Sequence, residues 1–124
     1  MQLLDCYNVK NLLGGVAKTN FYDWVDTALR NKAEFQMPVK TRMNQENGDY
    51  YAVMPCLYPK ENLAIVKMIG RHLPKPEEER TTMMSDMLIY EADTGVLKAV
   101  MDAEYITTLR TGASAAHSAL LYAR

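Results

Sequence analysis

The last thirty residues, 95–124, restrict the fold more than any other stretch of the sequence. Residues 96–101 are predicted to form a strand. Asp102 then supplies a carboxylate that can accept the free backbone N–H groups of a first helical turn, so a helix should follow at once. The apolar period of this helix is still running at Tyr122. We therefore expect a connecting element, in which a strand leads into a long helix and the helix leads into a further domain.

The first third of the chain is predicted to be mainly helical. Residues 1–4 are typical of a short strand, and residues 7–13 of a short helix that ends at Gly14-Gly15, because glycine tolerates the left-handed backbone of a helix end. Residues 18–34 have the clearest helical period. Their predicted apolar face consists of Phe21, Trp24, Val25, Ala28, Leu29 and Ala33, and their solvent-exposed face of Asp23, Asp26, Arg30 and Asn31.

From residue 35 onward the period changes to two, which predicts strands. Residues 35–43 alternate, and Pro38 places that strand at a sheet edge or a bulge. Prolines and charges predict a loop at residues 71–80. The further strands are predicted at residues 50–57, 63–70, 81–90 and 96–101. Helices followed by consecutive strands predict an α+β fold: an antiparallel or mixed sheet of about five to six strands, with the N-terminal helices, chiefly residues 18–34, on one face and a long C-terminal helix.

The composition argues against several classes of protein. The 124 residues, 48% of them hydrophobic, suit one domain with its own core. A net charge of -1 without a basic run argues against nucleic-acid binding, and no apolar stretch is long enough to span a bilayer. Cys6 and Cys56 are predicted to be reduced thiols in a cytoplasmic protein. His72 and His117 have no partners at ligand spacing, so no metal site is expected.

Lys67 is the most unusual residue of the predicted sheet. Its strand is apolar on both faces, with Ile65 and Ile69 on the face of Lys67 and with Val66 and Met68 on the other. Such a strand is normally buried on both faces, where an ammonium group is costly unless it is paired or loses its proton. The pattern leaves two interpretations open: an anion-binding or proton-transferring lysine, or a lysine whose stem packs at the sheet end while its head reaches water.

Three further cations are candidates for anion binding. Arg110 precedes the small residues 112–116, which leave space for a ligand, and a guanidinium there can bind a carboxylate through two parallel hydrogen bonds. The alternative is a helix-packing stripe beside a surface arginine. Lys40 and Arg42 lie on the polar face of their predicted strand and are solvated unless that face borders a cleft. No Ser/His/Asp set, carboxylate pair or glycine-rich phosphate loop can be assembled from the sequence.

A long and specific motif lies near the end of the chain. It consists of Asp93-Thr94-Gly95, Ala99-Val100-Met101-Asp102-Ala103 and Ile106-Thr107-Thr108-Leu109-Arg110-Thr111-Gly112-Ala113. Supporting segments are Met37-Pro38-Val39-Lys40, Gly48-Asp49, Val53-Met54-Pro55 and Lys67. Together these residues resemble the N-terminal part of the ornithine cyclodeaminase/mu-crystallin family, over essentially the whole chain and least clearly before residue 35.

The resemblance implies a substrate-binding and dimerisation domain whose sheet pairs with that of a second subunit. In this family the last helix leads into a Rossmann domain that binds NAD or NADP, and hydride is exchanged with an amino acid or imino acid, as in ornithine cyclodeaminase, alanine dehydrogenase and ketimine reductases. By position, Lys67 resembles the catalytic lysine that contacts the substrate carboxylate and assists proton transfer. Arg110, and either Lys40 or Arg42, resemble further carboxylate ligands. Ala52 stands where several members carry a charged residue, which argues against ornithine as substrate.

The G-x-G-x-x-G fingerprint of a Rossmann domain does not occur in the 124 residues. We therefore expect residues 1–124 to be a substrate-binding and dimerisation domain truncated before its dinucleotide-binding domain, unable to bind NAD or NADP or to catalyse hydride transfer alone. One alternative is a non-catalytic module that dimerises or binds a small molecule. Another is a degenerate fragment, which predicts aggregation through the last helix. On that helix Ala116, Leu120 and Leu121 are expected to be exposed unless a partner covers them.

Overall fold

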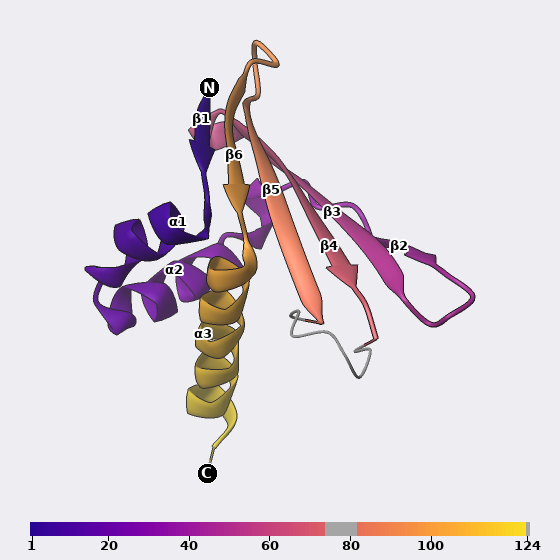
Figure 1. Ribbon diagram of the computed structural model, residues 1–124. Coiled ribbons are helices and arrows are strands. Elements are labelled where there is room, and N and C mark those ends of the chain that lie inside the picture. Colours follow the sequence, from indigo (N-terminus) through magenta and orange to yellow (C-terminus); the bar gives the residue numbers. More distant parts are fainter. Residues whose placement is uncertain (74–81, 124) are drawn as a thin grey trace.

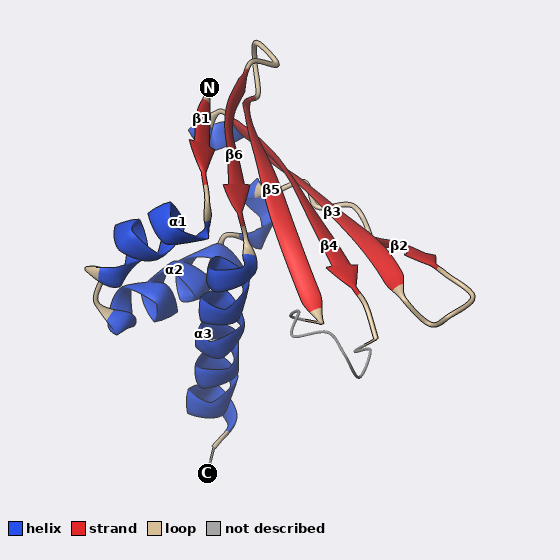
Figure 2. Ribbon diagram, viewed as in Figure 1, coloured by secondary structure: helices blue, strands red, loops and turns tan. Residues whose placement is uncertain are grey.

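The computed structural model describes residues 1–73 and 82–123. In these residues six strands form one sheet in the order β1-β6-β5-β4-β3-β2, and three α-helices lie beside it (Figures 1 and 2). The strands are β1 (Gln2–Leu4), β2 (Thr41–Asn44), β3 (Tyr50–Tyr58), β4 (Leu63–Arg71), β5 (Met83–Glu91) and β6 (Leu97–Asp102). The helices are α1 (Cys6–Gly14), α2 (Lys18–Arg30) and α3 (Glu104–Tyr122), with short 3-10 turns at η1 (Lys32–Glu34) and η2 (Pro59–Glu61). The predicted α+β fold is confirmed.

The sheet is mixed because its first strand runs the other way. Strands β2 to β6 pair as an antiparallel series of neighbours, and Gly48, with φ +88°, provides the left-handed turn between β2 and β3. Strand β1 pairs in parallel with β6, so that Leu3 lies beside Val100. Strand β1 is therefore an edge strand of the sheet, beside β6, the strand that leads into α3 (Figure 1).

The two faces of the sheet differ in burial. Cross-strand partners share a face because successive side chains of a strand point to opposite sides. One face carries Ala52, Ile69, Ala99 and Lys67, all of them buried. The other carries Val53, Pro55, Val66, Met68, Leu88 and Val100, which are half-buried except for Met68, at 42% exposed. We call the second set the open face.

Strand β5 fixes the start of α3 against the buried face. The Ala103 N–H donates to the Ser85 carbonyl at 2.7 Å, and the hydroxyls of Ser85 and Thr107 lie 3.3 Å apart. Asp102 Oδ1 accepts the N–H of Glu104 at 3.0 Å, as predicted for its carboxylate, but the N-cap residue of α3 is Ala103. From there α3 runs on in the direction of β6, while strands β2 to β5 splay away from it (Figure 1).

Helix α2 is less buried than its sequence period predicts. It ends at Arg30, and residues 32–34 form the separate turn η1. It packs chiefly against α3 rather than on the sheet, and part of its apolar stripe stays uncovered. Trp24 is 54% and Leu29 52% exposed. Asp26, which we expected in solvent, is instead partly buried against α3.

The predicted strand at residues 35–43 is also wrong over most of its length. Strand β2 begins at Thr41, and before it the chain has a single bridge, between Gln36 and Leu57. Pro38 has no N–H to donate to a ladder, and Val39 is 89% exposed. The other predicted strands are confirmed to within two residues. Residues 74–81, which include most of the predicted loop 71–80 and the start of the predicted strand 81–90, lie outside the described residues.

Candidate functional site

Lys67 lies at the middle of the sheet, on its buried face. It is flanked on β3 by Met54 and on β5 by Met87, and it is 8% exposed. No carboxylate among residues 1–73 and 82–123 pairs with it. No side-chain nitrogen or oxygen in the described chain is fully buried without a partner, so its ammonium group still reaches open space. The structure therefore places an unpaired basic nitrogen at a mostly apolar site, as the burial pattern predicts.

The surroundings of Lys67 make its proton easy to lose. Burial, and then the positive charges of Arg110 and Lys40, lower the pKa of Lys67 from 10.5 to about 8. Both neighbours must lie close for their charges to act on it. Arg110 comes from α3 and Lys40 from the segment before β2, so three elements bring three of the predicted cations together.

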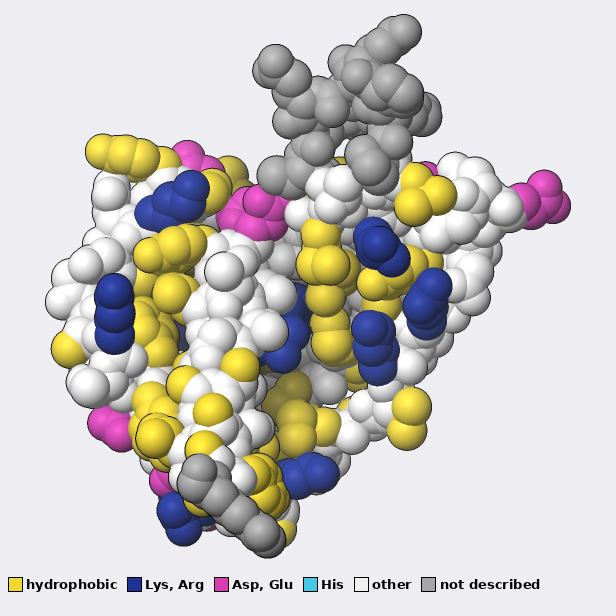
Figure 3. All heavy atoms as spheres, turned by 90° about the horizontal axis from the view of Figure 1, so that it is seen from below, with side chains coloured by type: hydrophobic (Ala, Val, Ile, Leu, Met, Phe, Trp, Pro, Cys, Tyr) yellow, Lys and Arg dark blue, Asp and Glu magenta, His cyan; other side chains and the backbone are white. Residues whose placement is uncertain are grey.

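The position of Arg110 follows from the contact between α3 and β5. Thr107 faces the sheet through Ser85, and Arg110 lies three residues further, on the same side of the helix. The Arg110 side chain is exposed, and its carbonyl accepts the hydroxyl of Ser114 at 2.8 Å. Arg110 thus borders the hollow between α3 and the sheet. Figure 3 shows Lys and Arg side chains in this hollow and on the sheet surface beside it.

Lys40 and Arg42 both approach the ring of Tyr50, a residue that the sequence analysis did not single out. The guanidinium carbon of Arg42 lies 3.8 Å from the ring centre, and the Lys40 nitrogen 5.9 Å. Arg42 Nε also donates to Asn44 Oδ1 at 2.7 Å. These contacts hold Arg42 on the ring. Lys40, and not Arg42, is the residue whose charge acts on the pKa of Lys67.

His117 has a partner on another helix, which its isolation in the sequence did not suggest. Its Nε2 lies 2.7 Å from Asp26 Oδ1, and the other oxygen of Asp26 accepts from Arg30 Nε at 2.7 Å. The Tyr22 ring lies beside the imidazole, with centres 5.4 Å apart. The hydrogen bond from Arg30, and then that with His117, lower the pKa of Asp26. The i,i+4 spacing of Asp26 and Arg30 was visible in the sequence, but the link to α3 was not.

His72 likewise pairs with a carboxylate. Its Nδ1 lies 3.2 Å from Asp49 Oδ2, and the N–H of Leu73 donates to Asp49 Oδ1 at 2.7 Å. The bond from Leu73, and to a smaller extent that with His72, lower the pKa of Asp49. The pair joins the β2–β3 turn to the end of β4. No group of three or more His, Cys, Asp or Glu in the described chain could hold a metal ion.

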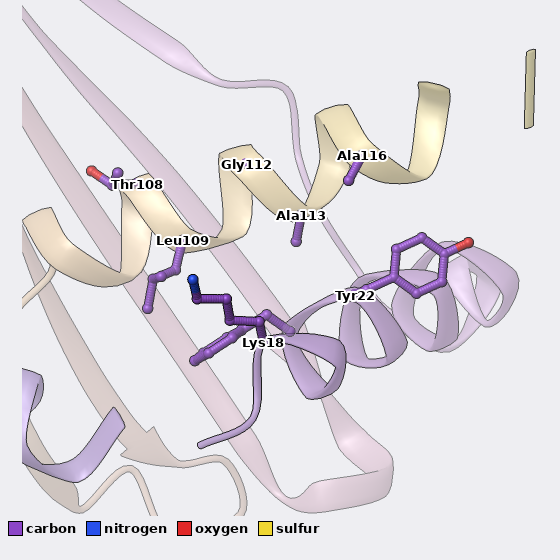
Figure 4. Close-up of a pocket in the computed structure, with 8 residues that line it drawn as sticks. Lys18, Tyr22, Thr108, Leu109, Gly112, Ala113 and Ala116 are labelled. Carbon is purple, nitrogen blue, oxygen red and sulfur yellow. The ribbon is translucent and has the colours of Figure 1, made fainter. Parts of the chain in front are cut away.

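Two apolar pockets lie on the helices. One, of about 310 Å³, separates α2 from α3. Figure 4 shows Lys18 reaching from the start of α2 toward Leu109, with Tyr22 further along near Ala116. The other, of about 330 Å³, lies between α2, α3 and β3 and includes Cys56, whose thiol pKa is raised by burial. Among the described residues no helix is long and apolar enough to cross a membrane.

Comparison with known proteins gives the family. The model of the ornithine cyclodeaminase/mu-crystallin family matches residues 3–124. The chain belongs to this family. An alanine dehydrogenase of Archaeoglobus fulgidus is 37% identical over 89 residues, which are 72% of this chain and 27% of that protein.

Solved structures of other proteins share the fold. An archaeal alanine dehydrogenase dimer with bound NAD superimposes with a TM-score of 0.79 at 29% identity, over 92% of this chain and 34% of that one. A lysine cyclodeaminase gives a TM-score of 0.85 at 22% identity, over 100% of this chain and 39% of that one. The chain thus spans little more than a third of the length of these two proteins, and about a quarter of the dehydrogenase from Archaeoglobus fulgidus.

Proposed function

We propose that this chain is the substrate-binding part of an NAD- or NADP-dependent enzyme that acts on an amino acid or imino acid. The cluster of Lys67, Arg110 and Lys40 supports the proposal. The positive charges of Arg110 and Lys40 repel the buried ammonium group of Lys67, which costs free energy unless an anion joins the three groups. No described carboxylate pairs with Lys67, so the anion is best supplied by a ligand.

An α-carboxylate fits these cations. Arg110 would bind it with two parallel hydrogen bonds, and Lys40 and Lys67 would complete its coordination. Because the pKa of Lys67 is about 8, both its charged and its neutral form are present near neutral pH. Lys67 is therefore also suited to accept or donate a proton at the neighbouring amino or imino nitrogen, as a catalytic residue.

The surface around Lys67 favours a substrate with a small or apolar side chain. The nearest positions on the same face are Ala52, Met54, Ile69 and Met87. None of these side chains offers an anion to a second ammonium group, so a diamino acid such as ornithine would leave its charge unpaired. We propose an alanine-like substrate rather than a diamino acid.

The residues of this chain do not fit a dinucleotide. Its glycines do not form the G-x-G-x-x-G pattern, whose helix N-terminus holds the pyrophosphate. We propose that residues outside 1–124 bind the nicotinamide cofactor. The purified 124-residue chain should show no L-alanine-dependent reduction of NAD or NADP, measured by nicotinamide absorbance. Turnover that persists after repeated purification would contradict this.

The open face suits a second copy of the chain. It presents apolar side chains from β3, β4, β5 and β6, and one of the similar structures is a dimer. We propose that two copies associate through this face.

Isothermal titration of the chain with pyruvate and with L-alanine tests the carboxylate site. Removing the guanidinium with Arg110→Gln should weaken binding at least about tenfold, since a charge-assisted bond is worth about 1.5–3 kcal/mol. The control is Lys98→Gln. Lys98 is an exposed lysine on β6 that pairs with Glu91 of β5 at 3.6 Å, and its charge does not act on the pKa of Lys67. Equal affinity of wild type and Arg110→Gln would refute the site.

A further inference from the structure

The Lys67 side chain is placed to act as a nucleophile as well as to bind an anion. It stands on a rigid central strand between two methionines, it has no carboxylate partner among the described residues, and it still reaches open space. A lysine amine becomes reactive toward carbonyl carbon when it is desolvated or placed beside another cation, because both effects favour the neutral amine. Lys67 meets both conditions, with Arg110 and Lys40 as the cations.

We propose that Lys67 Nζ condenses reversibly with the carbonyl carbon of a 2-oxo acid, forming a covalent imine at the centre of the sheet. This inference rests on the proposed carboxylate site, because Arg110 and Lys40 would hold the carboxylate of the oxo acid while Lys67 faces the adjacent carbonyl. Because they hold the carboxylate, the two cations would make the reaction faster for 2-oxo acids than for carbonyl compounds that have no carboxylate.

The step balances without any oxidant or reductant. The nitrogen lone pair forms a C–N bond to the carbonyl carbon, and the C–O π electrons move to oxygen. That oxygen then leaves as water, carrying the two hydrogens that the neutral amine loses. The neutral amine that the step requires is abundant near pH 8 at Lys67, whereas an exposed lysine with a pKa of 10.5 is almost entirely protonated there.

Reductive trapping tests the proposal. The 124-residue chain is incubated at pH 8 with pyruvate and sodium cyanoborohydride, whose hydride reduces the imine to a stable secondary amine. Modified peptides are then identified by mass spectrometry. Lys67 should gain the mass of pyruvic acid less one oxygen atom, at least about tenfold faster than the exposed Lys60 and Lys98. Modification of Lys67 at the rate of these lysines, or slower, would overturn the proposal.

Variants separate the roles of the cluster. Lys67→Arg keeps the charge and should abolish the fast modification, whereas the surface control Lys98→Arg should leave it unchanged. Arg110→Gln should slow modification by pyruvate more than modification by acetaldehyde, because acetaldehyde has no carboxylate and is affected only by the lost charge beside the Lys67 amine. Equal slowing with both reagents, or with neither, would overturn the assigned role of the cation.

The outcome also distinguishes this inference from the proposed function. If L-alanine binds the wild-type chain but no imine is trapped at Lys67, the covalent step is wrong and the carboxylate site stands. If neither L-alanine nor pyruvate binds and no imine forms, both are wrong. Trapping at Lys67 with binding of L-alanine supports both.

Discussion

Lys67 shows how a single buried charge can lower the stability of a folded chain. Its charge is buried between apolar neighbours and repelled by Arg110 and Lys40, and its pKa falls to about 8 in consequence. A lysine on the surface of the same sheet would keep its charge in water at no such cost. The folded chain therefore holds Lys67 at the expense of stability, which is common where a residue serves binding or catalysis.

This cost has a defined pH dependence. Between pH 8 and 10.5 the unfolded chain, with Lys67 at its ordinary pKa, binds more protons than the folded chain. The free energy of unfolding should therefore rise with pH across this range. Below pH 8 the full cost is present, and it is about 3 kcal/mol at most, since one unit of pKa corresponds to about 1.4 kcal/mol.

Replacing the charge should thus stabilise the protein. We expect Lys67→Met to raise the free energy of unfolding at pH 7 by about 1–3 kcal/mol and to remove the rise between pH 8 and 10.5. Urea denaturation at several pH values measures both. Lys98→Met, at an exposed position, serves as the control and should follow the wild type. The same pH dependence in wild type and Lys67→Met would show that Lys67 is solvated.

At the scale of elements, α3 joins the two halves of the molecule because its two sides make different contacts. Thr107 and Arg110 face the sheet, and His117 contacts α2 through Asp26. The packing of α2 against α3 therefore supports the helix that carries the candidate carboxylate ligand. His117 is 7% exposed, so its bond to Asp26 is sheltered from water over most of the imidazole.

Removing this contact should weaken the helix pair. We expect His117→Ala to lower the free energy of unfolding by about 1–3 kcal/mol, the usual cost of losing a buried hydrogen bond and its packing. Because the pKa of Asp26 is lowered in the folded chain, its contribution is present above its ordinary value of 3.8 and is lost as the pH falls below that value.

Urea denaturation between pH 6 and pH 3 tests both expectations. The loss of stability in acid should be smaller in His117→Ala than in the wild type. Ser118→Ala, at the next and exposed position, should leave stability and its pH dependence unchanged. An acid transition that is identical in all three proteins would mean that the hydrogen bond with His117 does not lower the pKa of Asp26.

At the scale of the whole molecule, the sheet has one covered and one open face. Helix α3 meets the sheet on the side of Ser85 and Lys67, and Val66, Leu88 and their neighbours on the opposite face are half-buried. A contiguous apolar surface of this kind is unusual on a monomer and typical of an interface. Leu120 and Leu121, near the end of α3, are 72% and 57% exposed, which confirms the expectation for this helix.

A charge at the centre of the open face should prevent association. Val66 and Leu88 are cross-strand partners there. We expect Leu88→Glu to shift the chain from dimer to monomer at micromolar concentration, with a loss of affinity of about a hundredfold or more, because the carboxylate would be buried without a partner. Size-exclusion chromatography with light scattering measures the mass. Leu12→Glu on α1, where Leu12 is 63% exposed, should leave the dimer intact. A wild-type chain that remains monomeric would refute the interface.

The sequence alone determined the features that depend on neighbouring residues. Short apolar runs between turns, at residues 50–57 and 63–70, predicted strands β3 and β4, and the carboxylate of Asp102 predicted the start of α3 to within two residues. Both signals come from neighbouring residues and are therefore local. The burial of Lys67 followed in the same way from a strand that is apolar on both faces. The family motif around Arg110 was likewise a property of consecutive residues.

The tertiary structure decided which distant groups meet. It placed Lys40 rather than Arg42 within reach of Lys67, joined Asp26 to His117, and left Trp24 exposed on a helix whose period predicts burial. These outcomes depend on how elements pack, because a side chain at a given period is buried only if another element covers it. For the same reason the side-chain pattern alone gave each cation singly, and only the packing of α3 and of the segment before β2 brings the charges of Arg110 and Lys40 to act on Lys67.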